Sequence, residues 1–228
     1  MDQRSEKILS AILKEYLKTA QPVGSTVLVS KYKLGISSAT VRNAMNELEE
    51  NGYIVQPHTS SGRIPTALAY KSFLSDLTSV KIAAKPFVTQ LSDDLELDFK
   101  NLAREVAEST GLSVFWAINK RNFFHTGISN LLTQPEFIQT NLIYNISAMI
   151  DAMELIIEKK FEAFSDGLQV LIGEDNPFSP LCSSLILKYK ISGLSGLVGI
   201  IGPLRMNYES SLAVMKLIEE KIKYYDKR

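Results

Sequence analysis

The chain has 228 residues, of which 45% are hydrophobic and 22% are charged, and its acidic and basic residues balance to a formal net charge of zero. This length permits one large domain or two small ones, and the composition is typical of a soluble globular protein. With one cysteine, no signal-peptide pattern and no run that approaches a membrane span, we exclude an intramolecular disulfide and expect a cytoplasmic protein that contacts no membrane.

The first 50 residues contain three predicted helices. Apolar residues recur at helical spacing from Arg4 to Thr19, and a Pro-Val-Gly break then ends this first helix. Ser25 caps a short second helix, and a turn containing Gly35 leads to a third helix that Ser37 or Ser38 opens. This order predicts a helix-turn-helix.

The third predicted helix has two different faces. Its apolar face has the i, i+3, i+4, i+7 spacing and consists of Val41, Ala44, Met45 and Leu48. The opposite face is nearly free of acids. Because arginine pairs well with guanine and asparagine with adenine, Arg42 and Asn43 are predicted base contacts. Phosphate or peripheral contacts are expected from Ser38, Thr40 and Asn46. The alternative interpretation is a helical hairpin with a solvated polar face.

A short strand over residues 53–56, a polar turn and a returning strand at Ile64 follow the third helix. Together with the three helices they predict a winged helix, and the turn is expected to contact the neighbouring DNA groove. Its candidate residues are His58, Ser60, Ser61 and Arg63. Residues 1–76 carry nine basic and seven acidic residues, so the predicted non-specific attraction to DNA is modest.

The sequence predicts two domains, residues 1–78 and 87–228, joined by a linker over residues 79–86. A helix from Thr66 to about Leu77 ends the first domain. The second domain is expected to contain helices over 87–110, 140–158 and 207–225, and strands over 112–118, 123–125, 168–172, 185–191 and 196–201. Helices beside a mostly antiparallel sheet predict an α+β fold class.

The sequence offers few groups for catalysis. It contains two histidines and one cysteine, without the spacing of a metal site or a phosphate-binding loop. Glycines at 193, 196, 199 and 202 lack the strand-before, helix-after context of a dinucleotide site, so we expect them to permit close strand packing or a turn. Cys182 lies among leucines and is predicted to be a buried structural thiol. We therefore predict no catalytic residue, no cofactor and no metal.

Six segments of the chain have a distinctive sequence. In the N-terminal domain these are Pro22–Ser25, Gly35–Asn43 and Gln56–Thr66, and the last of them is long and unusual in composition. In the C-terminal domain they are Gly127–Phe137, Ile172–Pro177 and Gly199–Tyr208. These segments closely resemble the HrcA family of bacterial heat-inducible transcription repressors.

The resemblance fails in the middle of the second domain. The resembled family has a long segment there, which includes an inserted subdomain linked to dimerisation, whereas this chain has only the eight residues Asn119–Thr126. We interpret the chain as a short version of the family, with its mode of dimerisation left open.

The resemblance implies a GAF-like second domain and binding of a homodimer to an inverted-repeat operator in double-stranded DNA upstream of chaperone genes. It also implies that a GroEL-type chaperonin promotes the active state. One alternative is a regulator that binds a small molecule in the second domain, with Phe115, Trp116 and Phe124 as pocket residues, although core packing is the preferred role for these rings. A hydrolase or transferase with an accessory DNA-binding domain is a third hypothesis.

Overall fold

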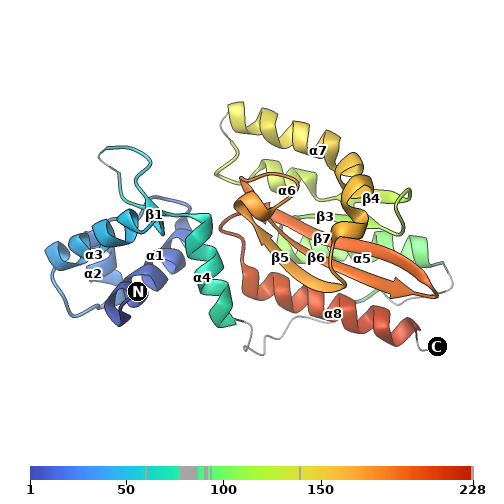
Figure 1. Cartoon of the computed structure of the whole chain (residues 1–228), viewed down its shortest axis with the longest axis horizontal. Helices are drawn as coiled ribbons and strands as arrows, with labels where there is room; N and C mark the ends of the chain where they lie inside the picture. Colours follow the sequence, from blue (N-terminus) through green and yellow to red (C-terminus); the bar gives the residue numbers. More distant parts are fainter. Residues whose placement is uncertain (60, 78–86, 90–91, 93, 139, 227–228) are drawn as a thin grey trace. The chain divides into compact units, whose positions relative to one another are not determined.

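The computed structural model describes residues 1–226 apart from 60, 78–86, 90–91, 93 and 139. The chain divides into two compact units, Met1–Val80 and Lys81–Arg228, which we call the head and the body and describe separately (Figure 1). The predicted linker, residues 79–86, lies outside the described residues.

The head contains helices and two short strands in the order α1 (Gln3–Thr19), α2 (Ser25–Tyr32), α3 (Ser38–Glu50), β1 (Ile54–Val55), β2 (Ile64–Pro65) and α4 (Ala67–Leu77). The strands pair antiparallel, and Val23 adds an antiparallel bridge to Arg63. Burial of apolar side chains holds the three helices together, because Ile12, Leu28 and Val41 are each fully buried. This arrangement is a winged helix.

Local signals set the boundaries of α3. Of the two serines predicted to open this helix, Ser37 is the cap, since its Oγ accepts the backbone N–H of Thr40 at 3.1 Å. Gly35 and Gly52 lie on either side of the helix with positive φ angles, where other residues would be strained.

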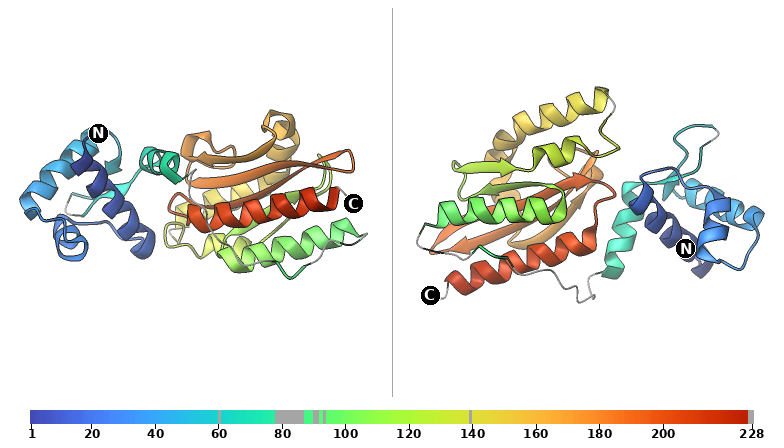
Figure 2. Two further views of the ribbon diagram at one scale, coloured as in Figure 1. Left: turned by 90° about the horizontal axis from the view of Figure 1, so that it is seen from below. Right: turned by 180° about the vertical axis from the view of Figure 1, so that it is seen from behind.

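The body is built on a five-stranded antiparallel sheet with strand order β4-β3-β7-β6-β5. Its strands are β3 (Ser113–Ala117), β4 (Phe123–Thr126), β5 (Gly167–Ile172), β6 (Cys182–Ile191) and β7 (Leu194–Pro203). Its helices are α5 (Leu95–Thr110), α6 (Ile128–Leu132), α7 (Thr140–Lys160) and α8 (Tyr208–Asp226), with short 3₁₀ turns at Phe161–Ala163 and Gly173–Asp175. Helices α5 and α8 cover one face of the sheet, and α6 and α7 cover the other (Figure 2). The predicted fold class, a winged helix followed by a GAF-like α+β domain, is confirmed.

Aromatic rings fill the core on both faces of the body's sheet. The Trp116 ring stacks on Phe99 with a centroid distance of 4.5 Å, and its Nε1 donates to the Tyr189 hydroxyl at 2.7 Å. Phe115 belongs to the core cluster on the α7 side of the sheet. Both Phe115 and Trp116 are fully buried, and Phe124 stacks on Trp116. These contacts support a packing role for the three rings.

The glycines of β7 make room for aromatic rings. A Cβ on Gly196 would lie 2.3 Å from the Tyr189 ring, and a Cβ on Gly199 would lie 2.3 Å from the Phe115 ring. Gly193 has a positive φ in the turn between β6 and β7. Close packing and a turn, the predicted roles of this glycine series, are both present.

Two sequence-based boundaries in the body were wrong, and one helix was missed. The predicted helix start at Phe87 is replaced by a start at Leu95, where Asp94 caps α5 by accepting the Leu97 N–H at 3.1 Å. Val88 and Thr89 instead donate their backbone N–H groups to the side chain of Glu105, at 2.9 and 2.7 Å. Strand β6 begins three residues before its predicted start, and the short helix α6 was not predicted.

Strands β3 and β4 form a tight hairpin. The Ile118 N–H donates to the Asn122 carbonyl at 2.9 Å, and Asn119 Oδ1 accepts the N–H groups of Arg121 and Asn122. The five residues between these strands therefore fold as a turn, within the region where the resemblance predicts a shortened chain. Within the described part of the chain, no helix is long and apolar enough to cross a membrane.

Candidate nucleic-acid interface

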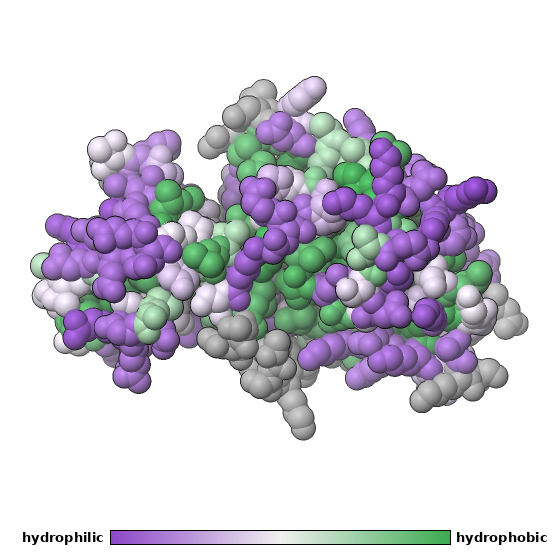
Figure 3. All heavy atoms as spheres, viewed as in Figure 1, coloured by the Kyte–Doolittle hydropathy of each residue, from purple (hydrophilic) through white to green (hydrophobic). Residues whose placement is uncertain are grey.

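Helix α3 presents one buried face and one exposed polar face. Its apolar residues Val41 and Leu48 are almost fully buried, whereas Arg42, Asn43 and Asn46 are exposed. Hydrophilic side chains cover most of the head surface visible around this helix (Figure 3). The three exposed side chains offer hydrogen-bond donors and acceptors of the kind that reads base edges in a major groove.

The hydroxyl groups at the start of α3 already have partners within the head. Ser38 Oγ lies 2.9 Å from Ser25 Oγ, which connects the first turns of α2 and α3. Thr40 Oγ1 lies 2.9 Å from the Oγ of the capping residue, Ser37. Ser38 and Thr40 are half-buried. Both predicted contacts therefore also help to shape the N-terminal end of the recognition helix.

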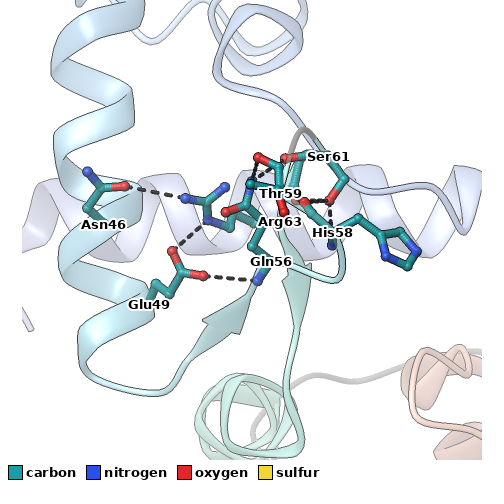
Figure 4. A network of polar contacts seen from close by, with 8 residues as sticks. Asn46, Glu49, Gln56, His58, Thr59, Ser61 and Arg63 are labelled. Carbon is teal, nitrogen blue, oxygen red and sulfur yellow. Dashed lines mark hydrogen bonds and ion pairs between the residues drawn. The ribbon is translucent and has the colours of Figure 1, made fainter.

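The wing, residues 56–63 between β1 and β2, is closed by its own hydrogen bonds. The Ser61 hydroxyl lies 2.7 Å from the His58 carbonyl and 3.1 Å from the His58 backbone nitrogen. Gln56 Nε2 donates to the carbonyls of Thr59 and Ser61, both at 3.0 Å. His58 and Thr59 are exposed, and the His58 ring points away from α3 (Figure 4). Ser60 lies outside the described residues.

Arg63 lies at the base of the wing, where its side chain turns toward α3. Its Nε donates to Glu49 Oε2 at 2.8 Å, and its Nη2 lies 3.5 Å from Asn46 Oδ1 (Figure 4). Its backbone N–H and carbonyl both bond to Val23, and its side chain is only 16% exposed. The structure therefore brings Arg63 and Asn46 together through side-chain contact.

Two residues that take part in this network, Glu49 and Gln56, were not among the predicted site residues. In the sequence Glu49 is one of three acids near the end of α3, and its spacing does not separate it from its exposed neighbours Glu47 and Glu50. Only the folded arrangement places Glu49 against the wing. Gln56 was predicted as part of a strand, and no local pattern indicates that its side chain holds the wing.

An open groove of about 460 Å³ runs between the start of α2 and the wing. Gly24, Ser25 and Thr26 line it from α2, and Arg42 lines it from α3. The N-terminus of α2 adds a partial positive charge to this groove. Backbone amides, hydroxyls and an exposed guanidinium are groups that bind phosphates along a duplex.

The described residues of the body contain neither a reactive thiol nor a metal-binding cluster. Burial raises the pKa of the Cys182 thiol to about 12, so this side chain stays protonated and is a poor nucleophile. The described residues contain no group of three or more His, Cys, Asp and Glu side chains that could hold a metal ion.

Comparisons with known proteins identify curated relatives that match either about half of this chain or nearly all of it. A heat-inducible transcription repressor HrcA from Desulforamulus reducens is 47% identical over 112 residues, which cover 47% of this chain and 30% of the relative. The HrcA of Moorella thermoacetica is 22% identical over an alignment of 331 positions that covers 96% of each chain. Because this chain has 228 residues, roughly a hundred positions of that alignment have no counterpart in it, as expected for a short version.

A solved structure described as a hypothetical protein has the same fold, with a TM-score of 0.83 at 19% identity over 100% of this chain and 99% of the other. The family model described as HrcA protein C terminal domain matches residues 66–212, which is more than half of the chain. The chain therefore belongs to the HrcA family, whose matched curated members are named heat-inducible transcription repressors.

Proposed function

We propose that this protein represses transcription by binding a specific DNA operator through α3 and the wing. The observation that carries this proposal is the exposed polar face of α3, which presents Arg42, Asn43 and Asn46, and Arg42 also lines the groove at the wing. A helix of this kind inserts its N-terminal half into a major groove, and the acids Glu47 and Glu50 lie in its other half.

Each candidate residue has a proposed role at the duplex. Arg42 and Asn43 contact base edges, because both are exposed on the first half of the recognition helix. Phosphate or peripheral contacts come from Ser38, Thr40 and Asn46. For the wing, the proposed residues at the flanking groove are His58, Ser60, Ser61 and Arg63.

The operator is proposed to be an inverted repeat that a homodimer binds. One recognition helix covers too few base pairs to select one site in a genome, and a twofold-symmetric dimer doubles the readout. The surfaces of α5 and α8 are proposed to form the dimer contact, since the inserted segment is absent. Light scattering on the chain with operator DNA tests this, and a monomer under those conditions would refute it.

Release on heating and recovery through a GroEL-type chaperonin complete the proposal. The body supports it because β7 contains no charged residue and is almost entirely buried, so unfolding exposes an uncharged apolar segment. Such a segment aggregates readily and is a suitable chaperonin substrate. Chaperonin with ATP is then expected to slow or reverse the loss of operator binding.

Selection of bound sequences from random duplex DNA tests the central proposal. The full chain is expected to enrich an inverted repeat whose half-sites have a fixed spacing. Enrichment of an unrepeated motif would contradict the dimer, and absence of any enriched motif would contradict sequence-specific binding.

A further inference from the structure

One carboxylate on the recognition helix contacts both ends of the wing. Glu49 Oε1 accepts the backbone N–H of Gln56 at 3.0 Å, and Glu49 Oε2 accepts the Nε–H of Arg63 at 2.8 Å. Gln56 is the first residue of the wing and Arg63 is its last. Both ends are therefore tied to the same side chain of α3 (Figure 4).

The contacts continue from this carboxylate into the loop of the wing. The Gln56 side chain reaches the carbonyls of Thr59 and Ser61, and the Ser61 hydroxyl closes the turn against His58. The wing is thus connected by hydrogen bonds to the helix that carries Arg42. A change at Glu49 is expected to alter the position of the wing without touching the proposed base contacts.

The same ion pair limits what Arg63 can do at DNA. Its guanidinium is mostly buried against Glu49 and Asn46, with a side-chain exposure of 16%. A phosphate would have to compete with the Glu49 carboxylate for this group, and charge-assisted pairs of this kind are the stronger hydrogen bonds. Arg63 is therefore better placed to fix the wing than to add a separate phosphate contact.

We infer that Glu49 is the positioning residue of the wing: it holds Gln56 and Arg63, and thereby fixes the wing relative to the recognition helix. This inference rests on the proposed DNA-binding function of the head. It assigns to an acidic residue a favourable effect on DNA binding, which is the opposite of what its charge alone predicts.

Whether the loss of Glu49 weakens or strengthens DNA binding tests the inference. Glu49→Ala and the matched control Glu47→Ala each remove one negative charge from α3, and Glu47 is exposed. Electrostatics alone strengthens DNA binding by both variants. Positioning by Glu49 instead weakens the binding of Glu49→Ala by about tenfold, while Glu47→Ala binds as well as the unmodified chain or more tightly. Glu49→Gln, which retains an acceptor oxygen, is expected to recover part of the loss.

Two further variants separate positioning from direct contact. Arg63→Ala is expected to weaken binding about as much as Glu49→Ala, and the double variant no more than either, because all three lose the same ion pair. The double variant keeps the net charge, so its binding is expected to show the salt dependence of the unmodified chain. A salt slope reduced by about one contact would identify Arg63 as a phosphate contact and overturn the inference.

A measurement without DNA makes the inference testable on its own. In the full chain, Glu49→Ala is expected to speed amide hydrogen exchange at Gln56 and across the wing, while exchange within α3 stays unchanged, as it does in Glu47→Ala. Equal exchange in the two variants would overturn the inference. If the unmodified chain selects no DNA sequence, the proposed function fails, whereas equal binding by Glu49→Ala and Glu47→Ala overturns only the role of Glu49.

Discussion

The recognition helix of the head and the central sheet of the body are held in place by different interactions. In the head, ion pairs join one element to the next: Lys31 on α2 binds Glu15 on α1, and Arg63 binds Glu49. The body also contains ion pairs, such as Arg205 with Glu136, but its central sheet lies between fully buried rings and aliphatic side chains, among them Trp116. The contact between α3 and the wing therefore depends on charge and responds to salt, whereas the central sheet of the body depends mainly on apolar packing and responds to temperature.

Heating is expected to produce the largest effect, complete and irreversible loss of operator binding, with the body unfolding first. The chain contains one tryptophan, Trp116, and it is fully buried in the body. Its fluorescence therefore reports on the body alone. We expect this signal to change at the temperature at which binding is lost, while amide exchange in α3 is still slow.

Unfolding of the head before the body would contradict this expectation. If α3 becomes unprotected while the Trp116 emission is unchanged, the head is the temperature-sensitive unit. If binding survives the transition of the body, unfolding of the body does not release the operator, and if the whole chain survives heating with binding intact, the temperature response lies elsewhere. Thermal unfolding measured at several heating rates shows whether irreversible aggregation determines the midpoint temperature.

Arg42→Ala is expected to weaken binding to the selected operator by roughly 1–3 kcal/mol, because a bidentate base contact is lost. Arg42 is exposed, so the melting temperature of the head should not change. Lys14→Ala on α1, which removes the same charge from an exposed position, is the matched control. Equal losses on operator and random DNA would make Arg42 a phosphate contact.

The faces of α3 could be predicted from the sequence because they follow from helical spacing, a local property. The buried row that includes Val41 and the exposed row that includes Arg42 are where the period places them. The wing's fold was predicted for the same reason, since strand and turn signals are also local.

The contacts that shape the site could not be predicted in the same way. Glu49 lies in a helix, and Arg63 lies in the wing fourteen residues later. The pair therefore exists only after folding. The start predicted for α5 was wrong for a related reason. Glu105, sixteen residues later in the sequence, binds the Thr89 N–H, and a helical pattern contains no signal for such a contact.

Glu15→Gln is expected to destabilise the head by about 1–2 kcal/mol at neutral pH, because a charge-assisted hydrogen bond to a buried carboxylate is weakened. The bond from Lys31, at 2.5 Å, lowers the pKa of Glu15, with a contribution from the Tyr32 hydroxyl, although burial opposes both.

The direction of this pKa shift gives the pH dependence. A carboxyl group whose pKa is lowered by folding adds stability above its ordinary pKa of 4.5, and this stability is lost as the pH falls below that value. The difference in melting temperature between the unmodified chain and Glu15→Gln should therefore be full at pH 7 and shrink below pH 4.5. A constant difference would show that the Glu15 charge does not stabilise the head.

The smallest expected effect concerns Ser38, which has both a structural partner and a proposed DNA contact. Ser25→Ala and Ser38→Ala break the same hydrogen bond between the two hydroxyls, so each should lower the stability of the head by about 0.5–1 kcal/mol. If Ser25 donates, the Ser38 proton is free to bind a phosphate. Ser38→Ala should then bind all duplexes about twofold to threefold more weakly than Ser25→Ala, because only Ser38→Ala also loses the phosphate contact. Equal affinities of the two variants, measured at a temperature where both are folded, would assign Ser38 to the fold of the head alone.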